Sequence, residues 1–221
     1  VKDVHNPFLL TMHCIAHKAA LASANAADES DLAKRFEAAL KEIICYFSHS
    51  TSRRTRLRQI QEELGLDELQ ILKLHTVRWL SRSAATSRIL TNYPALVKEF
   101  QEDSSILHEK MSSLWFVKSL VHFVDILSQQ AHVSRIFQKD HVPYKLIKSV
   151  VDATMGSLQN LYIAVNLEDK AELGNFGGFK GKELWQSIGG EQHFSFLDTE
   201  FKMDMHEYIH VLKEVKQFAE I

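Results

Sequence analysis

The residues of this sequence best suited to chemistry are a thiol and two imidazoles near its start, in His13-Cys14-Ile15-Ala16-His17. They follow an apolar run over residues 8–12, which predicts a short buried strand, and they open an alanine-rich helix predicted over residues 16–27. Cys14 and His17, three residues apart, would share one face beside the unpaired N–H groups of the first helical turn. That position suits a phosphate, a metal ion or a nucleophilic thiol with His17 as its base, although no third residue is identified that would orient such a pair.

Two further pairings of thiols and imidazoles could bind zinc. Cys14-x2-His17 followed by Cys45-x3-His49 supplies the four ligands of a tetrahedral site. The 27-residue spacer between the two halves is longer than such sites usually carry. Cys45 also falls on the apolar side of a predicted helix, where a buried thiol is expected. Whether these four residues bind zinc stays open.

An H-E-x-x-H pattern, His206-Glu207-Tyr208-Ile209-His210, lies on a helix predicted near the end of the sequence. In zinc peptidases the two histidines bind the metal and the glutamate activates a water molecule. Lys213 stands where one large class of these enzymes has glycine, and with 12 histidines a chance match is expected in about one chain in twenty. A zinc-dependent hydrolase is therefore kept as the enzymatic alternative.

The composition is that of an ordinary globular protein: 221 residues, 45% hydrophobic and 24% charged. Two cysteines do not make a disulfide framework, so we expect reduced thiols and a location in the cytosol or nucleus. No apolar run approaches the ~20 residues that span a bilayer, and no signal peptide is recognised, so no membrane contact is expected. Because the sequence starts at Val1 and opens within a pattern, we expect it to be part of a longer protein.

Charge is distributed unevenly along the chain. Residues 43–98 hold nine basic and four acidic side chains, a net charge of +5, whereas residues 166–221 hold six lysines and eleven acids, a net charge of −5. This asymmetry favours one surface for a polyanion and another for a different partner. Two solvated helical surfaces are the alternative.

Hydrophobic periodicity predicts the elements that would position these residues. An amphipathic helix is expected over residues 29–47, with Asp28 or Ser30 as its N-cap, and a second over residues 53–64, ended by Gly65. The second carries Arg53, Arg54, Arg56 and Arg58 near its start, where the helix dipole favours anions, so an external phosphate would relieve them.

Further helices are expected over residues 83–92, from Pro94 to about residue 101, over residues 113–139 as the central core helix, from Pro143 onward, and from Asp198 to the end. Six of the eight glycines fall between residues 173 and 193, which predicts a loop or a mobile flap. Gly177 and Gly178 beside two lysines match neither phosphate-binding glycine motif.

The order of these motifs resembles the hAT superfamily of cut-and-paste transposases, especially the zinc-finger proteins that animal genomes have derived from them. The resemblance consists of an apolar strand, the H-C-x-x-H at residues 13–17, two helices, S-x-x-R-R at residues 50–54, and V-R-W-L-S-R at residues 77–82. It covers residues 6–100 and fades beyond them, where that family carries a divergent helical insertion.

The resemblance implies a mainly α chain. A helical insertion domain over residues 28–221 would be attached to a fragment of an RNase H-like α/β core, one strand plus one helix, over residues 1–27. It also implies that Cys14 and His17 lie beside the active site and that Trp79 lies near a flipped or unstacked base. An indole can stack on a base with ~1–3 kcal/mol, and Arg78 can pair with a phosphate. A core position is the alternative for Trp79.

The hAT reaction requires three metal-binding carboxylates, and none of them matches a position in this sequence; they would precede Val1 and follow Ile221. We therefore expect no catalysis and no cofactor in this chain, and a divalent metal only together with those acids. The resemblance implies a nuclear nucleic-acid-binding or interaction module whose partner is DNA. The residues expected to contact DNA are Cys14, His17, Arg53, Arg54, Arg56, Arg58, Arg78, Trp79 and Arg82.

A protein-interaction scaffold is the remaining alternative to DNA binding. It would bind protein partners, or associate with itself, through the apolar helices of the insertion and the acidic C-terminal region.

Overall fold

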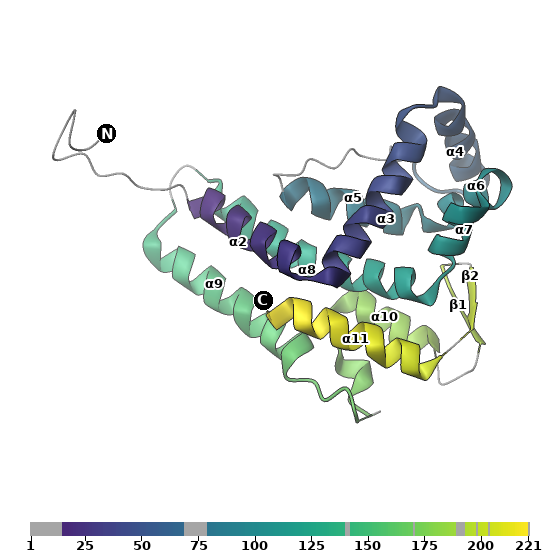
Figure 1. Ribbon diagram of the computed structural model, residues 1–221. Helices are drawn as coiled ribbons and strands as arrows, with labels where there is room; N and C mark the ends of the chain where they lie inside the picture. The colour runs from purple at the N-terminus through teal and green to yellow at the C-terminus, as the bar shows by residue number, and fades with distance from the viewer. Residues whose placement is uncertain are drawn as a thin grey trace, which may run out of the picture.

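The computed structural model of the chain describes residues 15–68, 79–139, 142–169, 171–188, 193–197, 199–202 and 204–220. This part of the chain is mainly helical, as the sequence predicts (Figure 1). A π-helical turn (Gln159–Ile163) continues α9, and a 3₁₀ turn lies at Leu173–Asn175. Strands β1 (His193–Phe196) and β2 (Thr199–Lys202) form an antiparallel hairpin. The α-helices are α2 (Ile15–Glu29), α3 (Asp31–Ser48), α4 (Thr51–Glu63), α5 (Trp79–Thr91), α6 (Tyr93–Asp103), α7 (Ser105–Met111), α8 (Leu114–Phe137), α9 (Tyr144–Leu158), α10 (Phe179–Ile188) and α11 (Met205–Glu220).

Serine side chains divide the first half of the chain into separate helices. Ser30, Ser50, Ser104 and Ser113 each accept a hydrogen bond from the backbone N–H three residues later, at 3.2–3.4 Å. Each cap satisfies an N–H group that the start of a helix leaves without an intrahelical partner. Of the two N-caps expected for α3, Ser30 is the one used. Gly65 follows α4 with a φ of 64°, which confirms the expected helix stop.

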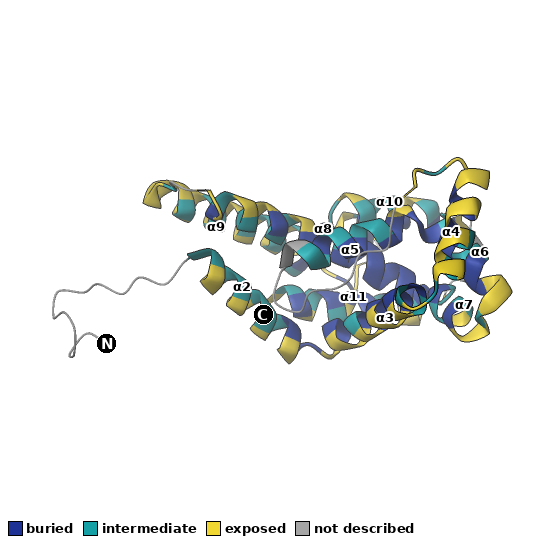
Figure 2. Ribbon diagram, turned by 90° about the horizontal axis from the view of Figure 1, so that it is seen from above, coloured by how far each residue is buried: buried dark blue, intermediate teal, exposed yellow. Residues whose placement is uncertain are grey.

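The predicted central helix is confirmed as α8, which contacts α2, α3, α5, α7, α9, α10 and α11. Phe116, Leu120 and Val121 on this helix have no exposed surface. Phe123 stacks on Phe36 of α3, with ring centroids 4.5 Å apart and planes 2° from parallel. Figure 2 shows buried residues concentrated along α8 and the inner sides of its neighbours. The core is therefore built around one enclosed helix.

Two expectations for the C-terminal region are wrong. The glycine-rich segment over residues 173–193 is not a loop throughout, because residues 179–188 form α10. The last helix begins at Met205 instead of Asp198, because residues 199–202 pair with β1. The glycines provide space for close packing: a Cβ atom built at Gly181 would lie 2.6 Å from the imidazole Cε1 of His122 on α8.

The structure tests some of the elements expected at the N-terminus. The predicted helix over residues 16–27 is confirmed as α2, which contacts α3 and α8. The expected domain boundary between residues 27 and 28 falls inside this helix, whereas the strand expected over residues 8–12 lies outside the described residues. Within the ranges that the structure describes, no helix is long and apolar enough to cross a membrane.

The contact between α8 and α10 depends on one buried carboxylate. Asp125 on α8 is 8% exposed. It accepts hydrogen bonds from the backbone N–H groups of Lys180, at 3.1 Å, and Gly181, at 2.8 Å. Burial raises the pKa of the Asp125 carboxyl, while these N–H groups act in the opposite direction. A side chain from α8 therefore caps the start of α10, where the helix dipole favours negative charge.

We expect Gly181→Ala to lower the free energy of unfolding by about 1–3 kcal/mol, because its methyl group would overlap the ring of His122. In a His122→Ala background the same change should cost less, since the opposing ring is gone. Urea denaturation of the four proteins measures both values. Gly156→Ala in α9 is the control, because its Cβ would meet nothing within 4 Å. An equal cost of Gly181→Ala in both backgrounds would contradict this account.

Candidate functional site

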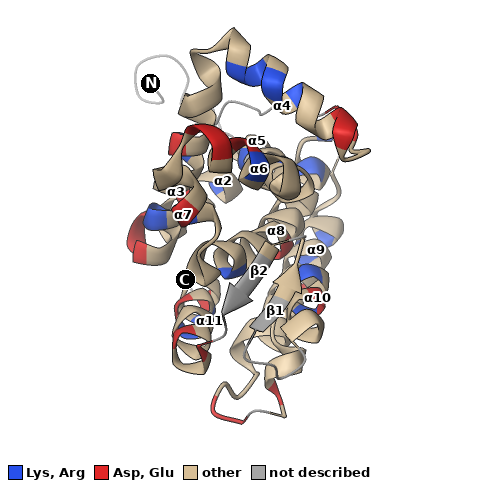
Figure 3. Cartoon of the chain, turned by 90° about the vertical axis from the view of Figure 1, so that its right-hand side faces the viewer, with Lys and Arg blue, Asp and Glu red and all other residues tan. Residues whose placement is uncertain are grey.

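The four arginines expected to bind phosphate lie together on α4. This helix starts after the Ser50 cap and buries Leu57 and Ile60. It packs against α3 and α6. Figure 3 shows basic residues along the first part of this helix and acidic residues at its end. Because the arginines occupy positions 53, 54, 56 and 58, they divide between the side of α4 that faces α6 and the side that faces solvent.

The inner two, Arg53 and Arg56, are held by carboxylates of α6. Arg56 donates from Nη2 to Oε1 of Glu99 at 2.7 Å and from Nε to Oε2 at 3.0 Å. Arg53 donates from Nε to Oδ2 of Asp103 at 3.1 Å, and its guanidinium lies 3.9 Å from the centroid of the Tyr46 ring. These two arginines fasten α4 to α6 and α3.

The same contacts shift the pKa values of this cluster. Glu99 has no exposed side-chain surface, and its hydrogen bonds raise the pKa of Arg56 above the usual range. Tyr46 donates to Asp103 at 2.6 Å, which is the main cause of the lowered pKa of that carboxyl. Burial, with hydrogen bonds to both carboxylates, raises the pKa of Tyr46. Near neutral pH the cluster therefore keeps Arg56 and Asp103 charged and Tyr46 protonated.

The outer two, Arg54 and Arg58, lie one helical turn apart on the exposed side. Arg54 donates to Oγ1 of Thr51 at 3.1 Å. Arg58 lies 2.6 Å from Glu68 in an ion pair whose partners are 55% and 53% exposed. An ion pair this exposed contributes little to stability and can be exchanged for a phosphate. The other exposed side chains of α4 are those of Thr51, Ser52, Thr55 and Gln59 and, after Arg58, the acids Glu62 and Glu63.

The net charge around α4 is smaller than the sequence window suggests. The +5 window ends at Lys98, and the next acids are Glu99, Glu102 and Asp103 on α6, which reduce the total to +2. Two of these three carboxylates bind the inner arginines. The surface available to a polyanion is therefore the outer face of α4.

Of the remaining residues expected to contact DNA, Arg82 and His17 have described side chains, and neither joins this surface. Arg82 on α5 lies 3.0 Å from Glu37 of α3, and its side chain is 13% exposed, so it holds two helices together. His17 is exposed on α2, which Figure 1 shows on a different side of the molecule from α4. The backbone of Trp79 begins α5, while Cys14 and Arg78 lie outside the described residues.

Two candidate zinc patterns have members on exposed helix surfaces. His206 and Glu207 are exposed on α11, and His210, 72% exposed, lies 3.6 Å from Glu214. Within the described residues, no three or more ligand-type side chains gather in a group that could hold a metal ion. Cys45 is exposed, contrary to the buried thiol expected there, because its position on α3 lies outside the stripe that packs against the core.

Sequence reasoning missed a row of polar groups on the core helix. Lys118 and His122 have no exposed surface, and neither Nζ of Lys118 nor either ring nitrogen of His122 has a hydrogen-bond partner among the described residues. Burial lowers the pKa of Lys118 to about 7 and that of His122 to about 3. Together with Asp125 they recur at steps of three and four, a spacing visible in the sequence as polar residues on one side of an apolar helix.

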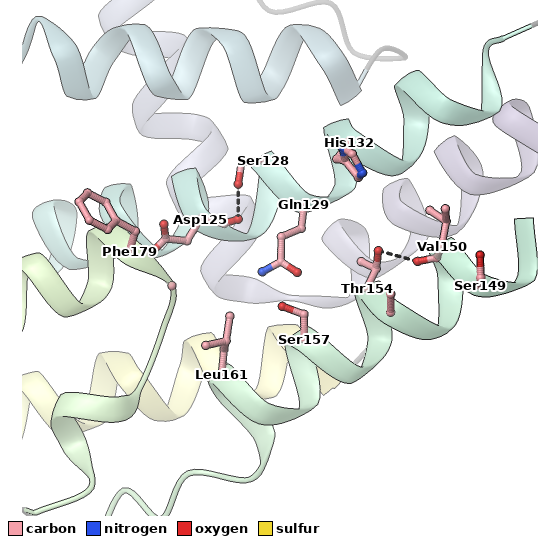
Figure 4. A pocket seen from close by; sticks show the side chains of 12 residues that line it. Asp125, Ser128, Gln129, His132, Ser149, Val150, Thr154, Ser157, Leu161 and Phe179 are labelled. Atoms are coloured by element: carbon pink, nitrogen blue, oxygen red, sulfur yellow. Dashed lines mark hydrogen bonds between the residues drawn. The ribbon is translucent and has the colours of Figure 1, made fainter. Parts of the chain in front are cut away.

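A cavity of about 810 Å³ lies beside this row, between α8 and α9 (Figure 4). Figure 4 shows Gln129 of α8 and Ser157 of α9 pointing toward each other across it. The sequence gives no direct sign of the cavity, because its lining residues come from segments that are far apart along the chain. No family model and no solved structure matches this chain.

We expect Glu99→Gln to lower the free energy of unfolding by about 1–2 kcal/mol, because an amide cannot form the charged, two-bond contact with Arg56. The value is reduced by the 36% exposure of the Arg56 side chain. Glu68→Gln, in the exposed pair with Arg58, is the control and should change stability by less than about 0.5 kcal/mol. Urea denaturation measures both values. Equal losses of stability in Glu99→Gln and Glu68→Gln would show that the pair of Glu99 with Arg56 contributes no more to stability than the exposed one.

We expect Lys118→Met to raise the free energy of unfolding at pH 7 by about 1–3 kcal/mol, because the buried ammonium is lost. The pKa of this lysine falls from 10.5 to about 7 on folding. Between these values the unfolded chain binds a proton that the folded chain does not, so stability rises with pH, while below pH 7 the full cost of burial persists. The advantage of the variant should therefore shrink as pH increases.

Urea denaturation of Lys118→Met and the wild type at pH 7, 8 and 9 measures this difference. Lys213→Met, at an exposed position on α11, is the matched control. A difference between Lys118→Met and the wild type that stays constant with pH would contradict the assignment.

Proposed function

We propose that this chain is a nucleic-acid-binding module that contacts the phosphate backbone through the outer face of α4. The observation that carries the proposal is the division of the α4 arginines. Arg53 and Arg56 are bound to α6, while Arg54 and Arg58 point outward from the helix that the inner pair makes rigid. Donors held on a rigid element bind an anion with less loss of conformational entropy than donors on a flexible loop.

The chemistry of the outer face fits this role. Thr51, Ser52, Thr55 and Gln59 add exposed hydroxyl and amide groups along α4, and Thr51 accepts a hydrogen bond from Arg54; side chains of these types contact phosphate and sugar in protein–DNA complexes. Arg54 is in the first turn of α4, where the helix dipole also favours an anion. Because phosphate contacts carry no sequence information, the proposed binding has little base specificity.

The resemblance to hAT transposases supports the same function. It extends the proposal to an origin from such a transposase, to an RNase H-like fragment over residues 1–27 and to a nuclear location. No residue of this sequence matches the three carboxylates of that family, so the proposal assigns binding and no reaction to the chain. Cys14, Arg78 and Trp79 keep the roles near DNA that the resemblance implies.

We expect Arg54→Ala/Arg58→Ala to weaken binding to duplex DNA and to reduce the slope of log K against log salt by about 1.8, because each lost phosphate contact removes about 0.9. Fluorescence anisotropy over a salt series measures the slope. Lys34→Ala/Lys213→Ala removes the same charge from exposed positions on α3 and α11 and should leave the slope nearly unchanged. No affinity of the wild type for DNA at low salt, or an equal loss in the control, would refute the proposal.

A further inference from the structure

Helix α9 is incompletely covered by the rest of the protein. None of its 15 residues is buried, although it carries two leucines, an isoleucine, two valines and a methionine. It contacts α8 along one side. Tyr144 is 78% exposed and Met155 is 64% exposed. An apolar helix with this much open surface is typical of a binding face.

The cavity between α8 and α9 gives this open surface the form of a groove. On α9 its wall contains Val150, Ala153 and Ser157, followed by Leu161 in the π-helical turn. These residues recur at steps of three and four and therefore share one face of the helix, which Leu146, 41% exposed, continues toward the start of α9. Phe179, 76% exposed, stands at the other end of the groove.

The opposite edge of the groove is basic. Ser128 and His132 line the cavity on α8, Arg135 continues the same face three residues later, and the exposed Lys139 follows two residues after the end of the helix. Residues 126–139 contain no acidic side chain. Within the described residues, neither Arg135 nor Lys139 is in an ion pair. The carboxylate of Asp125, at the far end, is already bound to the N–H groups of α10.

We propose that this groove binds an amphipathic helix of a partner protein, with an apolar stripe and an acidic polar face. The apolar stripe packs on Leu146, Val150 and Ala153, and the acidic side chains face Arg135 and Lys139. The length from Leu146 to Leu161 corresponds to about four helical turns, enough for a partner helix of about 15 residues. Nucleic acid would pair with the basic edge but would leave the apolar wall uncovered.

The experiment uses two labelled peptides with the same leucine stripe, one with glutamate and one with lysine at all polar positions, titrated with the full chain in fluorescence anisotropy. We expect the glutamate peptide to bind at least about tenfold more tightly, a difference of about 1.4 kcal/mol. Arg135→Glu/Lys139→Glu should reverse this preference. Lys34→Glu/Lys213→Glu, the matched charge reversal elsewhere on the surface, should not.

Leu146→Asp tests the apolar wall separately and should weaken both peptides by about tenfold. Its side chain is partly exposed, so the fold is expected to persist, and circular dichroism checks this. Equal affinity of the two peptides, or no effect of the charge reversal, would overturn the proposal. Two further outcomes would also overturn it: displacement of the glutamate peptide by an equally charged oligonucleotide, or a dimer of the chain in sedimentation that Leu146→Asp dissociates.

Discussion

The packing of α10 against the core helix depends on a single buried carboxylate. Asp125 lies on the most enclosed helix of the described chain, where a charge is costly unless it is hydrogen-bonded. Its partners are the first N–H groups of α10, which at most helix starts would be bound by a local serine or aspartate. Because Asp125 on α8 takes the place of a local cap, it fixes the start of α10 against α8. This close contact requires glycines where the two segments meet. A Cβ atom at Gly178 would lie 2.8 Å from the Asp125 carboxyl carbon. Through α10, the carboxylate also fixes the neighbouring β1.

Lys118 and His122, on the same helix, are buried polar side chains without such hydrogen-bond partners in the described part of the chain. Neither finds a hydrogen bond among the described residues, and burial shifts both pKa values toward the neutral forms. The ammonium of Lys118 lies 4.4 Å from the centroid of the Tyr208 ring, a contact that offsets part of the cost of its charge. His122 is enclosed by the rings of Tyr162 and Phe176. The polar residues of α8 therefore have opposite effects on stability, although their spacing in the sequence is regular.

Local signals were sufficient for much of this fold. Apolar periodicity identified α3, α4 and α8, Ser30 was among the residues expected to start α3, and Gly65 located the end of α4, because these signals depend on residues close in sequence. The predictions failed where the local structure depends on a residue that is distant in the sequence. The glycines before α10 indicated a loop until the ring of His122 and the carboxylate of Asp125 were placed opposite them. Likewise, the arginines of α4 formed a single basic cluster in the sequence, because the carboxylates that bind two of them belong to α6, just beyond the basic window.

The two basic surfaces of the molecule differ in how much of their charge is already matched. On α4, two of four arginines are bound to carboxylates from α6, of which Glu99 is wholly buried, and Arg58 is in an exposed ion pair with Glu68, so most of these charges are already matched. Arg135, near the end of α8, and Lys139, just after it, are exposed beyond the groove-lining His132 and have no ion-pair partner among the described residues. A count of charges along the sequence favours α4 as the site that binds an anion. The contacts in the structure instead leave the basic side chains beside the groove without ion-pair partners among the described residues. Unmatched charge next to uncovered apolar surface indicates a binding face more strongly than charge alone, because a partner must satisfy both at once.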